Sequence, residues 1–372
     1  MSTVRTNNIL DASGGNTATI NSMTPTADSL QGFRNRIING DMRIDQRNAG
    51  ASVTPTTSAY TLDRWQFIIS QSSKFTTQQN AGSVTPPTGF SNYLGITSSS
   101  AYSVTSGDFF VIDQRIEGFN TSDLAWGTAN AKTITISFWV RSSLTGTFGG
   151  AIRNSAQDRS YPFSYTISSA NTWEQKSVTI AGDTSGTWIG STNGVGLSVN
   201  FSFGTGTTYS GTAGAWSASN LVSATGATSV VGTNAATWYI TGAQLEVGSV
   251  ATPFERRDYG RELLMCQRYF WMIADANNDP VPATVNIGGV SPYADFIPPT
   301  TMRTTPSAYQ VSSLYRFNGS SSDNNYTGTW TVDGIGGGNV VRIFFSSTVS
   351  VGDTSLVRMF ESGKYFGLSA EL

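Results

Sequence analysis

The chain has 372 residues, of which only 12% are charged, and its net charge at pH 7 is −2. So little positive charge provides no attractive field for nucleic acid or an anionic membrane, which excludes both as expected partners. No residue is a histidine, and this excludes the Ser-His-Asp and Cys-His catalytic triads together with histidine metal sites.

The start of the chain carries no targeting signal. Its first ten residues contain no apolar segment of a signal peptide, and nowhere do about 18 apolar residues follow one another. We therefore expect a chain that is made in a cytoplasm and does not insert into a membrane. The single cysteine, Cys266, excludes a disulfide framework within the chain, and we expect it to be a small buried residue.

Residues 1–32 contain scattered Ile, Leu and Met without an amphipathic period. Such a segment cannot bury a core of its own, so it is either disordered or ordered by packing on another chain. The second alternative predicts an extended N-terminal attachment arm.

β-Strand patterns begin after this arm. The stretches 132–140, 161–167 and 197–203 alternate apolar and polar residues with a period of two, as half-buried strands do. Turn-forming Gly, Ser, Thr and Asn separate them at short intervals, which is typical of an antiparallel sandwich. Pro162 has no N–H to donate, which places it in an edge strand or at a strand's start. The sequence therefore predicts an all-β protein with one β-sandwich over residues 33–256.

Residues 204–237 of this domain have the composition of a Gly/Ser/Thr linker. Several large residues interrupt them, among them Leu221 and Val230, and another strand pattern follows. We therefore predict a long ordered loop, with a short strand near Val230, rather than a break between domains.

A short helical joint is predicted over residues 257–274. Leu263, Cys266 and Phe270 lie on one helical stripe, although the last part of the stretch is equally compatible with the start of a strand. Prolines then mark a boundary before strand patterns return, so residues 275–372 are predicted to form a smaller β-rich tip domain.

The Gly-rich stretch 334–339 has the look of a phosphate loop. No helix pattern follows it, and no Lys-Ser/Thr pair completes the motif. We therefore predict a hairpin connection between two strands.

Charge gathers at the predicted joint, where six charged residues fall within eight positions. They are Glu255, Arg256, Arg257, Asp258, Arg261 and Glu262. Pairs of Arg and Glu order a joint that is exposed on several sides without entering a core. The cluster is therefore predicted to be a subunit or domain joint, and an ordinary solvated face is the alternative.

Aromatic residues in polar loops are the main binding signal. Sugars present flat apolar C–H faces flanked by hydroxyls, so a glycan site joins an exposed Trp or Tyr to amide or charged groups. The predicted glycan-binding residues are Tyr209, Trp216, Asn324, Asn325, Tyr326 and Trp330. For each aromatic residue, a role as a core plug or loop anchor is the alternative.

Carboxylates are present without a pattern that selects a catalytic pair. Glycoside hydrolysis needs two of them about 5 to 10 Å apart and no histidine. The candidates in principle are Asp41, Asp45, Asp63, Asp108, Asp113 and Glu117. A chain with 24 acidic residues pairs some of them in any fold, so no catalytic residues are predicted.

Four long stretches, in the expected order over about residues 30–272, resemble tail-fibre and related virion proteins of bacteriophages. In those proteins a jelly-roll domain similar to carbohydrate-binding modules precedes a variable C-terminal part. The resemblance thus implies a jelly-roll form for the predicted sandwich. The stretches are "NRIINGDMRIDQRNAGASVTP" with "YTLDRW", "ISFWVRSSLTGTF", "NTWEQKSVTIAGDTSGTW" and "TGAQLEVGSVATPFERRDYGRELLMCQRYF".

Such modules often have a structural calcium site shared by an opening Asn-Gly-Asp strand and an acidic residue on the closing strand. The opening Asn39, Gly40 and Asp41 match this pattern, which makes Asp41 a candidate calcium ligand. On the closing strand, Gly242 and Gln244 stand where an Asp is expected, so the pattern is incomplete. No other cofactor is expected.

The resemblance implies a homotrimer whose N-terminal arm binds other phage tail proteins and whose C-terminal domain is outermost. In a trimer the arginines of the charged cluster would pair with acids of a neighbouring chain. We expect a non-enzymatic, tail-fibre-like adhesin of the virion that recognises host-surface polysaccharide. Two alternatives stay open, namely an architectural tail or capsid-decoration protein without sugar binding and a capsule-degrading enzyme.

Overall fold

A computed structural model describes residues 33–274, 280–281, 284–286, 293–309, 314–317, 325–326, 331–335, 340–344, 356–359 and 366–372. Over these residues the chain is almost entirely β-structure with a single α-helix, which confirms the all-β prediction. None of the described helices is long and apolar enough to cross a membrane. The predicted N-terminal arm lies outside the described residues.

The chain divides into two compact units. The first consists of Met1–Met42, Thr54–Ser58 and Phe67–Arg256. The second consists of Arg43–Val53, Ala59–Gln66 and Arg257–Leu372. The sequence pattern gave no sign that two segments near residue 50 belong to the second unit, because a local pattern carries no record of contacts made about 300 residues later.

The first unit contains most of the long strands and three 3-10 turns. Its strands are β2 (Trp65–Ile69), which begins in the second unit, β3 (Phe75–Gln79), β4 (Leu94–Ser98), β5 (Phe109–Glu117), β6 (Ile134–Ser142), β7 (Gly146–Arg153), β8 (Ser160–Ile167), β9 (Glu174–Ile180), β10 (Val195–Thr205), β11 (Ser210–Gly211), β12 (Ser223–Ala224) and β13 (Thr237–Val247). The 3-10 turns are η1 (Ala81–Ser83), η2 (Gly118–Asn120) and η3 (Ser122–Leu124).

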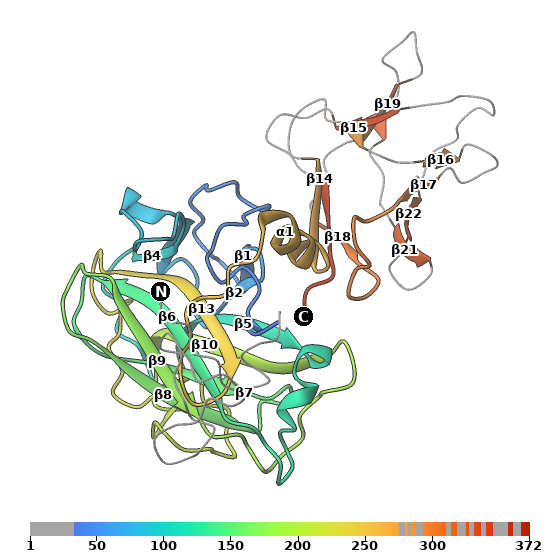
Figure 1. Cartoon of the computed structure of the whole chain (residues 1–372). Coiled ribbons are helices and arrows are strands. Elements are labelled where there is room, and N and C mark those ends of the chain that lie inside the picture. The colour runs from blue at the N-terminus through green and yellow to red at the C-terminus, as the bar shows by residue number, and fades with distance from the viewer. Residues whose placement is uncertain are drawn as a thin grey trace, which may run out of the picture. The chain divides into compact units, whose positions relative to one another are not determined.

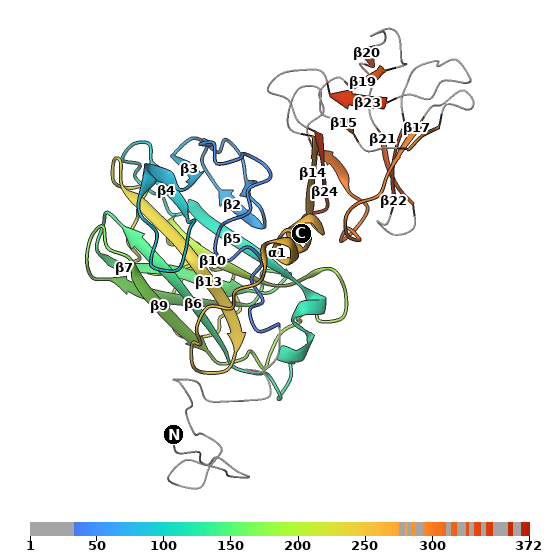
Figure 2. The same ribbon diagram turned by 45° about the horizontal axis from the view of Figure 1, so that its top comes forward.

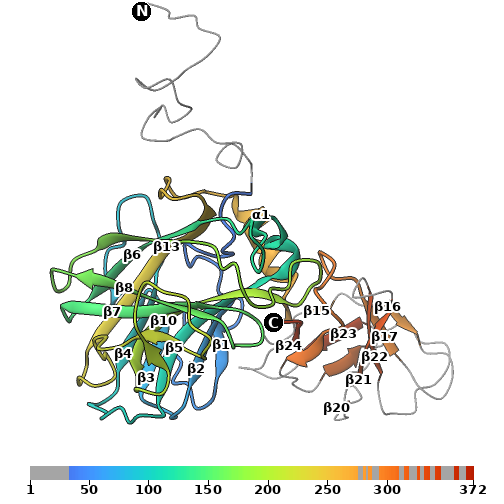
Figure 3. The ribbon, with the colours of Figure 1, turned by 90° about the horizontal axis from the view of Figure 1, so that it is seen from below.

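Two sheets form the layers of a sandwich in the first unit (Figure 1). In one sheet β2, β5, β10, β7 and β8 follow one another, and Figure 3 shows this layer from below. In the other the order is β3, β4, β13, β6 and β9, with β13 between β4 and β6 (Figure 2). Strands β5, β10, β7 and β8 pair antiparallel in the first layer, and all pairings of the second layer are antiparallel, for example β6 with β13.

Aromatic side chains join the two layers. Phe138 of β6 and Phe201 of β10 are both fully buried, and their ring centroids lie 4.9 Å apart at 72°. Phe75 of β3 contacts Phe203 of β10 in the same edge-to-face manner at 5.0 Å. Edge-to-face contacts are favourable beyond the burial of their apolar area, so these pairs fix the layers against each other.

The predicted strands are present with the predicted faces. In β6 the alternate residues Ile134, Ile136, Phe138 and Val140 are all fully buried. Pro162 lies in β8, the last strand of its sheet, as its missing N–H requires.

The prediction of a short strand near Val230 is wrong. The loop after β10 contains β11 and β12, which pair in parallel, whereas Val230 is a fully buried plug outside any strand. Its backbone N–H donates a hydrogen bond to the carbonyl of Phe203. The backbone donor is thus satisfied although Val230 is not in a strand, and the apolar side chain can be buried.

The residue before the helix of the second unit, α1 (Tyr259–Gln267), fixes where this helix begins. Asp258 is the N-cap, and its carboxylate accepts a hydrogen bond from the N–H of Arg261 at 2.9 Å. The helix ends at Gln267, and β14 (Phe270–Ala274) follows it closely. The predicted helical joint over residues 257–274 therefore contains both a helix and a strand. Of the predicted apolar stripe, Cys266 and Phe270 are fully buried, while Leu263 is only half-buried.

Short strands make up the rest of the second unit. They are β1 (Ala59–Leu62), β15 (Pro280–Val281), β16 (Thr284–Asn286), β17 (Tyr293–Phe296), β18 (Ser307–Tyr309), β19 (Leu314–Phe317), β20 (Asn325–Tyr326), β21 (Thr331–Ile335), β22 (Val340–Phe344), β23 (Leu356–Met359) and β24 (Phe366–Ser369). Strands β21 and β22 pair antiparallel from Thr331 opposite Phe344 to Ile335 opposite Val340, which confirms the hairpin predicted around the Gly-rich stretch.

The C-terminal end of the chain is anchored in the second unit by ion pairs. The Glu371 carboxylate pairs with the guanidinium groups of Arg47, at 2.9 Å, and of Arg64. These two guanidinium groups also lie over the rings of Phe270 and Tyr269, each 3.6 Å from the ring centroid. All three charged side chains are at most 7% exposed, so the segments near residue 50 are tied to the last residues of the chain.

Asp63 lies in this buried region, and it makes stability depend on pH. Burial raises the pKa of Asp63 to about 7, although Arg47 and hydrogen bonds from Gln46 oppose the rise. Between about pH 4 and pH 7 the folded protein therefore holds one proton more than the unfolded chain, and the free energy of unfolding falls as pH rises. The variant Asp63→Asn is expected to remove this contribution, about 1.4 kcal/mol per pH unit within that window. Denaturant unfolding of both proteins from pH 4 to 8 measures it, and parallel curves contradict it.

Candidate binding groove

A groove of about 270 Å³ lies on the face of the β2–β5–β10–β7–β8 sheet that points away from the core. In β5 the side chains of Phe110 and Ile112 are fully buried in the core, so the alternate side chains face the other way. The residues that line the groove are Ile68, Phe109, Val111, Arg115, Arg153, Gln157, Tyr209, Asn220 and Val222.

Two aromatic rings form the apolar part of the groove. Tyr209, from the loop after β10, is half-buried, and its ring stands at 80° to that of Phe109 with 5.0 Å between centroids. The carbonyl of Tyr209 accepts a hydrogen bond from Val222 at 2.8 Å, which ties the two arms of the loop together. The loop thus holds an aromatic side chain at the groove in a fixed position.

The turn before Tyr209 is fixed by Asp108. The Asp108 carboxylate accepts hydrogen bonds from Ser70, Tyr102 and the N–H of Thr105 at 2.8–2.9 Å. Burial alone would raise the pKa of Asp108, but these hydrogen bonds stabilise the carboxylate and hold the pKa below its ordinary value. Its backbone carbonyl accepts from Gly206, where a Cβ would lie 2.0 Å from the Thr105 carbonyl, so only glycine fits.

The polar part of the groove is built around Arg153 at the end of β7. Its Nη1 donates to the side-chain oxygen of Asn220 at 2.7 Å, and its Nη2 donates to that of Asn200 at 3.1 Å. Asn220 in turn donates to the side chain of Gln157 at 3.1 Å. These contacts join a strand, a turn and the covering loop, and they place guanidinium and amide groups beside an aromatic pair.

Arg115 is the second cation of the groove. Its Nε lies 3.1 Å from the carboxylate of Asp113, two residues earlier on β5. Asp113 is fully buried. The Arg115 side chain is 26% exposed and so remains accessible at the rim. An aromatic platform, two guanidinium groups and two amides together suit a ligand that has both apolar faces and many hydroxyls.

Trp216, the second predicted loop residue, lies in a different aromatic cluster and is not among the residues that line the groove. Its ring contacts those of Tyr161, Trp126 and Trp188 at 5.2–5.5 Å, and its Nε1 donates to the carbonyl of Ala181. These contacts give Trp216 the role of a loop anchor. A second cavity, of about 310 Å³, lies beside Trp126 and Trp188 and contains no charged side chain among its described lining residues.

The remaining predicted glycan-binding residues are in the second unit. Asn324 and Trp330 lie outside the described residues. Asn325 and Tyr326 form β20, which pairs with β19, and their side chains are outside the description. The proposed C-terminal site therefore stays a prediction.

Two residues of the charged cluster belong to the first unit, and each has a partner there. The Glu255 carboxylate accepts a hydrogen bond from the N–H of Asn35. Arg256 lies over the rings of Phe90, at 4.7 Å, and Phe254, at 5.7 Å. These contacts connect the end of the first unit to its beginning and to the loop before β4.

The other four residues are in the second unit and act around the start of α1. Arg257 and Glu262 form a buried ion pair at 3.3 Å, with 3% and 5% of their side chains exposed. Asp258 caps the helix through the N–H of Arg261. Much of the charge in this stretch thus serves contacts within the chain, while pairing between chains stays a prediction.

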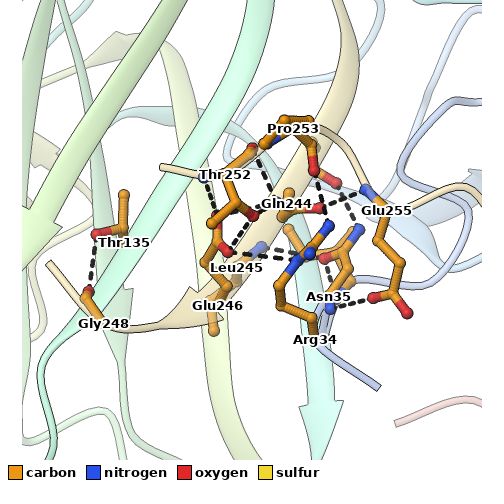
Figure 4. A network of polar contacts seen from close by, with 12 residues as sticks. Arg34, Asn35, Thr135, Gln244, Leu245, Glu246, Gly248, Thr252, Pro253 and Glu255 are labelled. Atoms are coloured by element: carbon orange, nitrogen blue, oxygen red, sulfur yellow. Dashed lines mark hydrogen bonds and ion pairs between the residues drawn. The ribbon is translucent and has the colours of Figure 1, made fainter. Parts of the chain in front are cut away.

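The opening segment of the first unit, at Arg34 and Asn35, meets the closing strand β13 through hydrogen bonds and an ion pair (Figure 4). The Asn35 side chain accepts from the N–H of Leu245 at 3.0 Å and donates to the carbonyl of Ala243 at 3.1 Å. The Glu246 carboxylate lies 3.5 Å from Arg34 and accepts from Thr252. The opening segment and the closing strand are thus directly connected.

This meeting of strands does not fit the predicted calcium site. The Glu246 carboxylate already contacts a guanidinium group and a hydroxyl, and the backbone carbonyl of Asp41 accepts a hydrogen bond from Thr241 at 3.4 Å. Hard cations need several oxygens with carboxylates among them. Over the described residues, no group of three or more Asp, Glu, Cys or His side chains is arranged so that it could hold a metal ion.

Most of the groove was not found from the sequence. Arg153, Asn220 and Gln157 were missed, because their approach depends on a loop that folds back over the sheet from 67 residues away. The available signal was the charge on the outer face of β5, where Asp113 and Arg115 follow the apolar residues Phe109 and Val111. The predicted carboxylates Asp45 and Asp108 instead hold turns by accepting backbone N–H groups.

No protein-family model and no curated protein matches this sequence. Among solved structures, the chain is similar to the enzymatically active domain of tailspike protein 4 of bacteriophage CBA120, with 12% identity, a TM-score of 0.29 and coverage of 59% of this chain and 22% of that one. It is also similar to a putative sugar binding protein from Bacteroides thetaiotaomicron, with 13% identity, a TM-score of 0.33 and coverage of 58% and 100%. A family 11 carbohydrate-binding module from Clostridium thermocellum is a third, with 12% identity, a TM-score of 0.27 and coverage of 55% and 100%. Because these TM-scores lie below 0.5, the similarities carry no argument about the function of this chain. The ligand that the groove suits is therefore inferred from the groove's own residues.

Proposed function

We propose that this chain is a non-enzymatic glycan-binding protein and that the groove around Tyr209 holds one or two sugar rings. The observation that carries the proposal is the fixed aromatic pair of Tyr209 and Phe109 beside the guanidinium and amide groups of Arg153, Asn220 and Gln157. The volume of about 270 Å³ is close to the lower end of the range for small-molecule sites, about 300 Å³, which suits a short stretch of a glycan.

The biological setting that we propose is the tail of a bacteriophage, where the chain acts as a host-attachment adhesin. The four sequence stretches that resemble tail-fibre proteins support this setting. A homotrimer attached through residues 1–32 presents three grooves together, and weak single sites then gain avidity through effective concentration. Mass measurement of the full-length protein in solution tests the assembly, and a monomer at all concentrations contradicts it.

Removal of the aromatic platform tests the binding function. We expect Tyr209→Ala to weaken binding to bacterial surface polysaccharides by at least about tenfold, which corresponds to about 1.4 kcal/mol. Tyr209→Phe keeps the ring and should retain most of the binding. Titration of purified protein with polysaccharides that the wild type captures on a glycan array provides the measurement.

The matched control is Tyr259→Ala, because Tyr259 is 56% exposed and belongs to α1 in the second unit. Equal binding by the wild type and Tyr209→Ala, with both folded, contradicts the assignment of this groove. Incubation of the same polysaccharides with the wild type, followed by a search for new reducing ends, separates binding from hydrolysis.

A further inference from the structure

Arg153 is a buried cation without a matching anion. The residue is 5% exposed, yet it lines the groove. Its two terminal nitrogens donate to neutral amide oxygens of Asn200 and Asn220, and its Nε has no hydrogen-bond partner among the described residues. Burial of a guanidinium group that has only neutral partners is costly, so Arg153 marks a place where a ligand can supply an anion.

The nearby charges do not neutralise this cation. Asp113 attracts Arg153, but it lies beyond ion-pair distance and pairs with Arg115 at 3.1 Å. Burial lowers the pKa of Arg153, and the positive charge of Arg115 acts in the same direction. The described residues that line the groove include no Asp or Glu side chain.

We propose that the groove is specific for an acidic glycan and that the carboxylate of a uronic acid residue binds at the guanidinium group of Arg153. This inference rests on the proposed function, since it assigns the class of sugar that the groove takes. A hydroxyl of a neutral sugar also accepts a hydrogen bond from this guanidinium group, but only an anion restores the charge balance. The sugar ring then packs against Tyr209, and Arg115 at the rim adds a second attraction for the anionic chain.

The test uses fragments of polygalacturonate, alginate and hyaluronan, each compared with the same fragments after reduction of the carboxyl groups to primary alcohols. We expect the wild type to bind at least one acidic probe about ten- to hundredfold more tightly than its reduced form, which is the range of one hydrogen bond to a charged group. Higher ionic strength should weaken only the binding of the acidic form. Arg153→Gln should abolish the preference, so that the acidic and the reduced form bind this variant equally.

Two further variants keep the result interpretable. Arg153→Lys keeps the charge and should retain part of the preference, while a loss caused by misfolding is recognised from the thermal unfolding of each variant. Lys176→Gln removes one charge from β9 in the opposite sheet and should leave the preference unchanged. Equal binding of acidic and reduced probes, or a preference that survives in Arg153→Gln, overturns the inference but not the proposed function. Absence of binding to any probe, acidic or neutral, contradicts both.

Discussion

Replacement of Glu371 by alanine is expected to destabilise the second unit by about 3–5 kcal/mol. The variant leaves the guanidinium groups of Arg47 and Arg64 buried without their carboxylate, with only 2% and 1% of these side chains exposed. Denaturant unfolding, combined with proteolysis of the C-terminal segment, measures the effect.

A surface ion pair provides the comparison for this prediction. Glu174 and Lys176 on β9 are 2.6 Å apart, but 16% and 20% of their side chains are exposed. Lys176→Ala, which removes the ion pair but keeps the backbone contacts of Glu174, should therefore cost at most about 1 kcal/mol. If both variants change stability by the same small amount, the C-terminal residues are not the anchor that the ion pairs indicate.

The second large effect is expected from Phe201→Ala in the core of the first unit. Phe201 is fully buried, contacts Phe138 of the opposite sheet and lies next to Asn200, which holds Arg153. Truncation of a buried phenylalanine costs about 3–5 kcal/mol through lost burial and the cavity that remains. Thermal and denaturant unfolding give the value.

Loss of Phe201 should also weaken glycan binding in the groove. Asn200 and Phe201 are neighbours on β10 and face opposite sides of the same sheet, so a change of β10 at Phe201 also affects Asn200, which holds Arg153. The control is Phe119→Ala, since Phe119 is 57% exposed in η2. We expect this control to change the free energy of unfolding by less than about 0.5 kcal/mol. A core that tolerates Phe201→Ala as well as the surface tolerates Phe119→Ala contradicts the packing described for the two layers.

Strands and their faces were predictable because they depend on neighbours in the sequence. Alternation over 132–140 fixed the inward residues of β6, and the missing N–H of Pro162 fixed the edge position of β8. Val230 shows the limit of the same reasoning, since an apolar residue in a loop fills the core as well as one in a strand does.

The groove was only partly predictable, and Tyr209 and Trp216 show why. Both are aromatic residues in the same polar loop, so the sequence gave them the same role. In the fold, Tyr209 turns to the groove beside Phe109, whereas Trp216 packs among Trp126 and Trp188. The difference depends on which distant strand each ring meets, and no local pattern carries that information.

The spacing of the charged cluster predicts a subunit or domain joint, but it does not predict the partners of the individual residues. The cap of α1 by Asp258 and the pair of Arg257 with Glu262 are local and follow from the helix start. The contact of Glu255 with Asn35 spans 220 residues and is visible only in the fold.

The location of a bound glycan tests the central claim most directly. We would titrate isotope-labelled protein with the tightest acidic oligosaccharide and follow backbone amides and arginine Nε–H groups by nuclear magnetic resonance. The account predicts that the largest shift changes fall on Phe109, Arg153, Tyr209 and Asn220, with the Nε–H signal of Arg153 among them. Shift changes confined to the β3–β4–β13–β6–β9 sheet or to the second unit would contradict it.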